Sequence, residues 1–297
     1  MSTEAEATGA VNMCCANCGI AGVDEIKLQK CQDCDLVKYC STNCREEHRE
    51  QHNEECNMRA AILHDNQLFT QPPGSHRGEC PICFLPLSLE LKKVTFYSCC
   101  CTMICGGCVL AYNKSNGDRR CPFCREEPAT NEEEFKKRVM KRVKANDPAA
   151  LRFMGSERYH HERDYEGAIE YLTQAAELGN SDAHYNIGHM YWKGEGVEKD
   201  EEKKVYHYEV AAIGGHPSAR FNLGNHEEWN GRVDRAVKHW MISANLGHTR
   251  SMEALWDHYK RGNIPKEDLE ASLRTHQSAV DAMKSPQRDA AVASRRE

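Results

Sequence analysis

The chain has 297 residues, of which 40% are hydrophobic and 28% are charged, and its formal net charge is −6. This composition can bury hydrophobic cores, so it excludes a wholly disordered protein, and the length suggests two to three domains. No stretch approaches the roughly 18 consecutive apolar residues of a membrane-spanning helix, so we expect no membrane partner.

The 17 cysteines are confined to the first part of the chain. All lie between Cys14 and Cys124, and none lies between Arg125 and Glu297. The opening ten residues contain no basic residue and no apolar run, so they form no secretory signal, and we expect an intracellular protein, cytoplasmic or nuclear. A disulfide framework is then disfavoured, and an odd number of cysteines also fits closed pairing poorly. Metal binding is therefore the interpretation of this region.

Residues 1–13 are predicted to be disordered, and the first cysteine block follows at residues 14–56. Its eight candidate ligands are enough for two tetrahedral zinc sites. They are Cys15, Cys18, Cys31, Cys34, Cys40, Cys44, His52 and Cys56. Cys14 is a spare thiol, and we prefer Cys15 because it gives the two-residue gap to Cys18. An iron–sulfur site is the alternative for the block, but a histidine within two interleaved sets favours zinc.

The segment from Cys44 to Cys56 is predicted to be helical, because it is rich in Glu, Arg and Gln and has no Gly or Pro. An unbroken helix would place these two cysteines about 18 Å apart along its axis. One ion cannot bind both, so the two ends of the segment must serve different, interleaved metals. His48 is a competing ligand on this helix. We favour a partly exposed residue or a hydrogen-bond donor to a ligand at that position.

Residues 15–56 resemble the MYND-type zinc finger, and the stretch Tyr39–Ser41 also fits its pattern. The resemblance implies that one zinc ion is held by Cys15, Cys18, Cys40 and Cys44, and the other by Cys31, Cys34, His52 and Cys56. Arg45 and Arg49 depart from the family, which often has Gln and Trp at these places. In the family those residues help a groove to receive proline-containing peptides, so that specificity is not carried over to this chain.

Residues 57–78 are predicted to be a connecting helix followed by a linker rich in Pro and Gly. The second cysteine block, residues 79–126, again offers eight ligands for two zinc ions. They are Cys80, Cys83, Cys105, Cys108, Cys121, Cys124 and two of the triplet Cys99, Cys100 and Cys101. Adjacent ligands at Cys99 and Cys100 and spaced ligands at Cys99 and Cys101 are both feasible. We favour Cys99 and Cys100.

This second block resembles a RING finger, because Pro follows the first cysteine in two of its pairs and Arg125 follows the last cysteine. The resemblance implies one zinc ion on Cys80, Cys83, Cys105 and Cys108, and a second on Cys121, Cys124 and two cysteines of the triplet. The usual RING has a histidine among its ligands, whereas this block has only cysteines. Together the two blocks give a prediction of four zinc ions.

The RING resemblance also implies a partner. In RING ubiquitin ligases a shallow apolar patch docks the ubiquitin-conjugating enzyme, and the matching residues here are Ile82, Tyr112 and Pro122. Arg125 stands where such ligases carry a cation that contacts both the enzyme and ubiquitin, so catalysis would act by positioning the thioester-linked ubiquitin. The plainer interpretation is that Ile82 and Pro122 shape the metal loops and that Tyr112 packs the small core.

Residues 127–146 are predicted to form a basic, amphipathic connecting helix. Acidic residues come first and basic residues last, which suits the helix dipole, and Phe135, Val139 and Val143 form an apolar stripe. A nuclear-import or nucleic-acid patch is the alternative for its basic residues. We favour a solvated face, because the chain is acidic and has no second basic cluster of this density.

Residues 147–283 are predicted to form an α-solenoid with a capping helix, and its units repeat with a period of 33 to 36 residues. Small residues recur at Ala150, Ala183 and Ala219, each followed by an apolar residue and a glycine. A unit of this length holds two helices and two turns, which is typical of an α-solenoid. Each unit closes on a glycine suited to the left-handed position that ends a helix, and these glycines are Gly179, Gly215 and Gly247.

This half resembles Sel-1-like repeats, a relative of the tetratricopeptide class, over residues 147–262. Such repeats present a concave surface to other proteins, so we expect protein partners on the solenoid. Residues 264–283 are predicted to be a capping helix, and residues 284–297 a flexible tail. Four tryptophans are predicted to pack between helices, and they are Trp192, Trp229, Trp240 and Trp256.

The sequence thus predicts a multidomain protein with two small cross-braced zinc modules, MYND and RING, followed by an all-α solenoid. The leading hypothesis is an intracellular ubiquitin-protein ligase that recruits a conjugating enzyme through the RING and its protein substrate through the solenoid and MYND finger. The alternative is a non-catalytic scaffold, and nucleic-acid binding ranks last. No nucleophile–base pair, phosphate loop or carboxylate pair stands out, so no residue is predicted to be catalytic in its own right.

Overall fold

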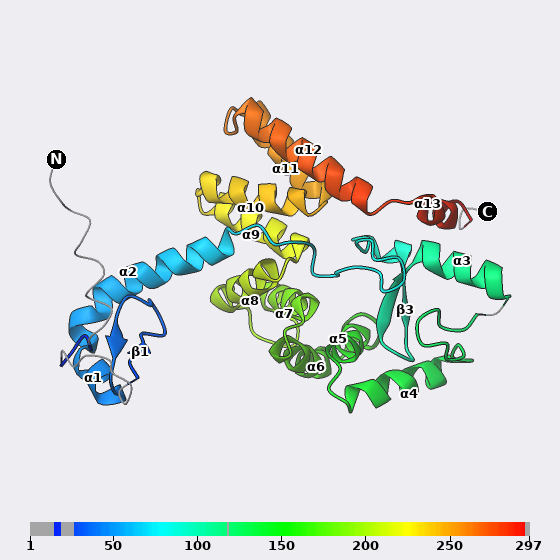
Figure 1. Cartoon of the computed structure of the whole chain (residues 1–297), viewed down its shortest axis with the longest axis horizontal. Helices are drawn as coiled ribbons and strands as arrows, with labels where there is room; N and C mark the ends of the chain where they lie inside the picture. Colours follow the sequence, from blue (N-terminus) through cyan, green and yellow to red (C-terminus); the bar gives the residue numbers. More distant parts are fainter. Residues whose placement is uncertain (1–14, 19–26, 118, 295–297) are drawn as a thin grey trace. The chain divides into compact units, whose positions relative to one another are not determined.

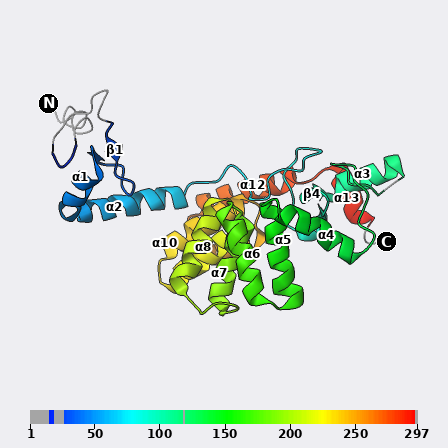
Figure 2. The same cartoon turned by 90° about the horizontal axis from the view of Figure 1, so that it is seen from below.

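The computed structural model describes residues 15–18, 27–117 and 119–294 (Figures 1 and 2). The chain divides into two compact units, Met1–Thr70 and Gln71–Glu297. Among the described residues, no helix combines the length and the apolar character needed to cross a membrane.

The first unit is built on cysteine-bearing loops and two helices. Its elements are β1 (Gln29–Lys30), β2 (Lys38–Tyr39), α1 (Thr42–Glu47) and α2 (Arg49–Leu68). The two short strands pair antiparallel. The helix predicted from Cys44 to Cys56 is interrupted at His48, where α1 ends and α2 begins. The two cysteines therefore lie on different helices, and α2 buries His52 and Cys56 in its first turns.

The second unit opens with the second cysteine module, which carries a hairpin and a helix. Its elements are the 3-10 turn η2 (Leu91–Lys93), β3 (Val94–Tyr97), β4 (Thr102–Cys105) and α3 (Gly106–Asn116). The strands pair antiparallel, with Val94 opposite Cys105. Cys105 also caps α3, because its sulfur accepts the N–H of Cys108. Leu87 and Ile104 supply the apolar core beside the cysteines.

Helix α4 (Glu132–Val143) joins this module to the repeats, and Asn131 caps its first turn. Val139 is fully buried and shares a cluster with Phe135 and Val143, as the apolar stripe predicts. Part of its basic face is paired with acids, since the Lys136 ammonium lies 3.1 Å from Glu132. The pair lowers the positive charge on this part of the helix.

Eight helices and a π-helical turn follow. They are α5 (Pro148–Glu157), η3 (Arg158–Glu162), α6 (Tyr165–Glu177), α7 (Ser181–Lys193), α8 (Glu201–Ile213), α9 (Pro217–Trp229), α10 (Val233–Asn245), α11 (Thr249–Lys260) and α12 (Lys266–Ala282). Helices pack in sequence pairs, α5 on α6, α7 on α8 and α9 on α10. The predicted glycines do end helices in left-handed conformations, with φ of 82° at Gly179 and Gly215 and 88° at Gly247.

The glycine inside each first helix of a pair has a packing role. A Cβ on Gly188 would lie 2.7 Å from the ring of Tyr208 on α8, and one on Gly155 would lie 2.7 Å from Leu172 on α6. No real side-chain carbon tolerates such contacts. The repeated glycine therefore lets the two helices of a pair approach closely.

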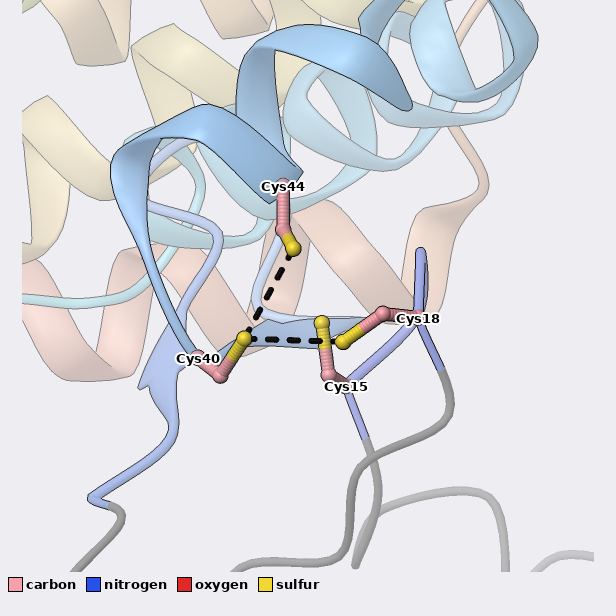
Figure 3. Close-up of side chains that lie close together, drawn as sticks. All are labelled: Cys15, Cys18, Cys40 and Cys44. Carbon is pink, nitrogen blue, oxygen red and sulfur yellow. Dashed lines mark hydrogen bonds between the residues drawn. The ribbon is translucent and has the colours of Figure 1, made fainter.

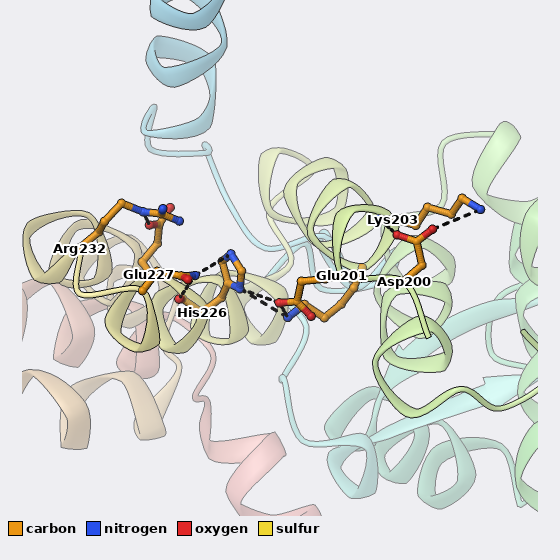
Figure 4. Close-up of polar contacts among 8 residues, drawn as sticks. Asp200, Glu201, Lys203, His226, Glu227 and Arg232 are labelled. Carbon is orange, nitrogen blue, oxygen red and sulfur yellow. Dashed lines mark hydrogen bonds and ion pairs between the residues drawn. The ribbon is translucent and has the colours of Figure 1, made fainter. Parts of the chain in front are cut away.

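Ion pairs add polar ties between α8 and α9 (Figure 4). Glu201 on α8 pairs with Lys204 on the same helix and lies 2.9 Å from Nδ1 of His226 on α9. At the end of α9, Glu227 pairs with Arg232 in the turn into α10. The Lys204 side chain is buried, whereas its partner Glu201 is 62% exposed, so solvent still screens this pair in part.

The four tryptophans do not share one environment. Trp240 is buried as predicted, but Trp229 is 80% exposed, and Trp192 and Trp256 are about half exposed. The prediction that all four pack between helices is wrong for these three. Trp192 and Trp229 lie in the last two residues of α7 and α9, where the helix is ending and its partner does not cover them.

The end of the chain also differs from the sequence prediction. Within the expected flexible tail, residues Pro286–Ala293 form a further helix, α13, capped by Ser285. Figure 1 shows α13 beside α3 of the second cysteine module, and the two helices pack together. Arg288 and Ala291 are buried in this contact. The helix is stabilised by its packing against the second cysteine module, and local composition does not predict such a distant contact.

The linker at residues 71–78 lies along the repeats. The N–H of His76 donates to the carbonyl of Gly215 at 3.0 Å, and Asn245 donates to the side chain of Gln71 at 3.3 Å. A Cβ on Gly215 would lie 2.6 Å from the carbonyl oxygen of Gly74. The linker is therefore attached to the second and third helix pairs of the solenoid.

Candidate metal centres

The first ligand set is brought together from a loop, the residue directly after β2 and helix α1 (Figure 3). Its members are Cys15, Cys18, Cys40 and Cys44, and their sulfurs lie within 4.8 Å of one another. The Cys40 sulfur lies 3.6 Å from those of both Cys18 and Cys44. Four thiolates about 2.3 Å from a tetrahedral zinc ion lie about 3.8 Å apart, so the arrangement has the size of a zinc site.

The second set combines the loop that carries Cys31 and Cys34 with the start of α2. Its members are Cys31, Cys34, His52 and Cys56, and all four are buried. The sulfurs of Cys31 and Cys56 lie 3.6 Å apart, and Cys34 Sγ lies 3.1 Å from Nε2 of His52. Since α1 serves the first set and α2 the second, the two sets interleave along the chain as the sequence predicts.

His48 takes no place in either set. Its Nδ1 lies 3.1 Å from the hydroxyl of Tyr39, and its ring stacks on that of His52 at 5.7 Å between centroids. It therefore supports the ligand His52 from the side. Cys14, the other competing ligand, lies outside the described residues.

The second module holds two further sets. The third is Cys80, Cys83, Cys105 and Cys108, and the fourth is Cys99, Cys100, Cys121 and Cys124. Sulfur–sulfur distances are 3.8 Å between Cys83 and Cys105 and 3.7 Å between Cys100 and Cys121. None of the described cysteines forms a disulfide.

The structure separates Cys100 from Cys101. Cys101 has a left-handed backbone, with φ of 51°, and its side chain leaves the fourth set. It is buried instead in the cluster that contains Val139, Ala150 and Met154. Burial raises the pKa of this thiol to about 12, so it stays protonated at neutral pH. This arrangement favours Cys99 and Cys100 as the pair of candidate ligands.

Three of the cysteine pairs share one backbone turn. The residue directly after the second cysteine has φ between 55° and 62°, and these residues are Asp35, Phe84 and Arg125. Its N–H donates to the carbonyl of the first cysteine at 2.8 to 3.2 Å. A positive φ is uncommon outside glycine. The turn aims both sulfurs at one point, as a shared metal requires.

The backbone and one arginine favour the thiolate form at several positions. Burial by itself raises the pKa of Cys83, but hydrogen bonds from the Leu85 backbone and the Arg288 guanidinium lower it to about 7. Burial likewise raises the pKa of Cys15, and N–H groups of Cys18 and Cys40 bring it down to about 6. Thiolates are the form that binds a metal, so the donor groups fit zinc.

Residues 15–56 match the MYND finger family. The MYND finger is a zinc-binding module, and the match covers the first two ligand sets. Residues 148–180 and 181–216 match the Sel1 repeat. The family models did not identify a RING-type finger in the second module. No curated protein matched the chain.

Two solved structures resemble the chain. A Sel1 repeat protein from Oxalobacter formigenes is 25% identical with a TM-score of 0.45, over 57% of this chain and 70% of its own. The protein c5321, a protective antigen of uropathogenic Escherichia coli strains with an SLR fold, is 22% identical with a TM-score of 0.42, over 60% and 38% respectively.

The residues that the RING resemblance implies for binding a conjugating enzyme lie at the surface of the second module. Ile82 is 38% exposed, Arg125 is exposed, and Tyr112 and Pro122 are half-buried. Two exposed aromatic side chains accompany them on the metal loops, and sequence reasoning missed both: Phe84 at 70% and Phe123 at 53%. Their position beside the cysteines was visible in the sequence, but their outward direction follows from the turn.

A further group, missed by sequence reasoning, looks like a metal site but is chemically different. Nε2 of His76 and Nε2 of His216 lie 3.1 and 3.3 Å from the same oxygen of Asp182. Nδ1 of His216 accepts the N–H of Ala219, so the His216 proton is on Nε2. A metal-bound histidine needs that nitrogen unprotonated and normally donates from the other. The group is a hydrogen-bonded tie between the linker, α7 and the start of α9.

The chain thus joins a MYND finger and further cysteine clusters able to hold metal to Sel1 repeats. Sel1 repeats generally mediate contacts between proteins. This combination indicates a protein-interaction scaffold.

Proposed function

We propose that residues 79–126 form a RING-type finger and that this protein is an intracellular ubiquitin-protein ligase. The observation that carries the proposal is the outward display of apolar side chains on both metal loops, Ile82 and Phe84 on one and Phe123 on the other. Exposed apolar side chains on the metal loops are suited to contact with another protein. The repeated turn that aims the sulfurs inward also aims these side chains outward.

The proposed activity needs no covalent intermediate on this chain. The metal loops would bind a ubiquitin-conjugating enzyme, and Arg125 would hold its thioester-linked ubiquitin in one orientation, which accelerates transfer by positioning. The solenoid and the MYND finger would hold the protein substrate. Arg125 is suited to this role because it is exposed and its backbone is fixed by the turn.

The proposal includes four zinc ions per chain, one for each ligand set. Native mass spectrometry of protein purified without chelator should give the mass of the chain plus four zinc ions. A stoichiometry of two would remove one module from the proposal.

A ubiquitination assay tests the activity. Full-length protein is mixed with activating enzyme, a panel of conjugating enzymes, ubiquitin and ATP, and chain formation is followed. Truncating a central docking residue typically costs more than about 1.4 kcal/mol, so Ile82→Ala and Arg125→Ala should each slow ubiquitin discharge roughly tenfold or more. Leu91→Ala is the matched control, because Leu91 is also exposed on this module but lies outside the metal loops.

Absence of chain formation with every conjugating enzyme would contradict the ligase proposal, as would full activity in both the Ile82→Ala and Arg125→Ala proteins. A non-catalytic scaffold would be supported instead if the second module holds all its zinc but shows no ligase activity, and the solenoid binds a partner. The combination of MYND finger and Sel1 repeats favours that second candidate if the assay is negative.

A further inference from the structure

Arg288 lies in α13, yet its side chain enters the second cysteine module. Its Nη1 donates to the carbonyl oxygens of Pro86 at 2.6 Å and Met283 at 2.7 Å. Its Nη2 donates to the carbonyl of Leu85 at 3.1 Å and to the sulfur of Cys83 at 3.4 Å. Arg288 is only 9% exposed, so the guanidinium is held inside the contact.

The surface that receives α13 is shaped for it. A Cβ on Gly107, in the first turn of α3, would lie 2.8 Å from the backbone nitrogen of Arg288 and 2.9 Å from the carbonyl carbon of Gln287. Both are main-chain atoms, which cannot rotate away as a side chain can. Only glycine at position 107 therefore allows the first turn of α13 to lie against α3.

The electrostatics of the third ligand set call for a cation. Four thiolates and one Zn²⁺ carry a net charge of −2, and three of the four cysteines are buried. A buried net charge is stabilised by a paired opposite charge and by hydrogen bonds to the sulfurs. Arg288 supplies the positive charge and a hydrogen bond to a sulfur, and its hydrogen bonds to Leu85 and Pro86 also fix the loop that follows Cys83.

We propose that α13, through Arg288, is a working part of the zinc centre formed by Cys80, Cys83, Cys105 and Cys108. Arg288 offsets the charge of the centre and fixes the loop of residues 83–86, so zinc retention depends on a helix 205 residues further along the chain. The inference rests on zinc being bound at this set, which is part of the proposed function, but it does not depend on ligase activity.

Zinc release from the full-length, zinc-loaded protein tests this role. The release of zinc to a chromogenic chelator is timed for three variants. Arg288→Met keeps the apolar stem of the side chain, and Arg288→Lys keeps its charge. Gly107→Ala displaces α13 but changes neither Arg288 nor any zinc ligand. Arg274→Met is the control, because Arg274 is an exposed arginine on α12. Native mass spectrometry counts the ions, and alkylation with mass mapping identifies which cysteines become reactive.

We expect one of the four ions to leave about 10- to 100-fold faster in Arg288→Met and in Gly107→Ala, the range typical of losing a group that supports a metal ligand. Cys83 and Cys105 should be alkylated first, while Cys100 and Cys121 stay protected and serve as the internal reference. Arg288→Lys should fall between the parent and Arg288→Met. The Arg274→Met protein should behave as the parent.

Parental release rates in both Arg288→Met and Gly107→Ala, with four ions present at the start, would overturn the inference alone. Equal release from the Lys and Met variants would overturn the part that assigns the effect to charge. A parental protein without zinc on this ligand set would overturn both the inference and the four-ion proposal. A four-zinc protein that is inactive as a ligase but loses zinc in Arg288→Met would overturn only the ligase proposal.

Discussion

The ring of Phe96 stacks on that of Phe153, with the centroids 4.9 Å apart and the planes inclined by 3°. Phe96 lies on β3 of the second cysteine module, and Phe153 lies on α5, the first helix of the repeats. Phe135 of α4 packs against both rings, at 6.3 and 5.4 Å. The module and the first repeat therefore share one aromatic cluster.

Replacing Phe153 by Ala should lower the free energy of unfolding by about 2 kcal/mol, less than the loss at a fully buried Phe because the ring is half-buried. Urea unfolding of the zinc-loaded protein measures this. Phe123→Ala is the control, since Phe123 is exposed on the same module, and it should change stability by less than about 0.5 kcal/mol. Equal losses in the two proteins would show that the aromatic cluster does not hold the module to the repeat.

Adjacent cysteines should behave differently on substitution. Cys100→Ser is expected to reduce the bound zinc from four ions to three, because the Cys100 sulfur lies 3.7 Å from that of Cys121 in the fourth set. Cys101→Ser should leave four ions, because the Cys101 side chain lies in an apolar cluster away from that set. Native mass spectrometry of both proteins decides the assignment. The opposite pattern would exchange their roles.

Gly188→Ala should destabilise the solenoid even though Ala is the better helix former. The added methyl group would lie 2.7 Å from the Tyr208 ring, and overpacking of this kind typically costs about 1–3 kcal/mol. Thermal unfolding followed by circular dichroism measures the change. Gly74→Ala is the matched control, because a Cβ there meets nothing within 4 Å, and it should be neutral or slightly stabilising.

Acid should weaken the tie between the linker and the repeats. Burial lowers the pKa of His216 to about 4, although its hydrogen bond to Asp182 acts in the opposite direction and nearby His76 adds to the lowering. An unfolded histidine titrates near 6.5, so the unfolded chain takes up the proton first. The stability that neutral His216 contributes is therefore complete above pH 6.5 and is lost as the pH falls toward 4.

The His216→Asn protein tests this pH dependence. Asn also caps a helix but does not titrate in this range, so it should remove part of the slope of unfolding free energy against pH. We expect the parent to lose on the order of 2 kcal/mol more than His216→Asn between pH 6.5 and 4. Because the other titrating groups are common to both proteins, parallel slopes would mean that His216 is not the group responsible.

Local signals in the sequence predicted much of the fold. The repeat period is read from the sequence directly, and the glycines that end helices act within a few residues; both features appear as expected. The resemblances to zinc-finger families imply the four ligand sets, and the structure brings those same side chains together. The spacing leaves the choice between Cys100 and Cys101 open, because that choice depends on the left-handed backbone of Cys101, which no spacing rule specifies.

The features that the sequence did not predict depend on distant contacts. Helix α13 is short, and its stability comes from Arg288 and Ala291 buried against a module far away in the chain. The pairing of His76 with Asp182 spans 106 residues. The exposure of Trp229 depends on which partner helix reaches the end of α9. In each case the deciding neighbour lies outside any local window of sequence.

The contacts of the second cysteine module at both ends of the repeats affect how the protein is made. The module touches the first repeat through Phe96 and the segment after the last repeat through α13. Because α13 follows the repeats in the chain, it is synthesised after them, and the module gains this contact only once the repeats have been made. A repeat array usually frays independently at its two ends. Here the two ends of the array are linked through one module, because Phe96 packs near the triplet of cysteines and Arg288 contacts Cys83 of the third ligand set.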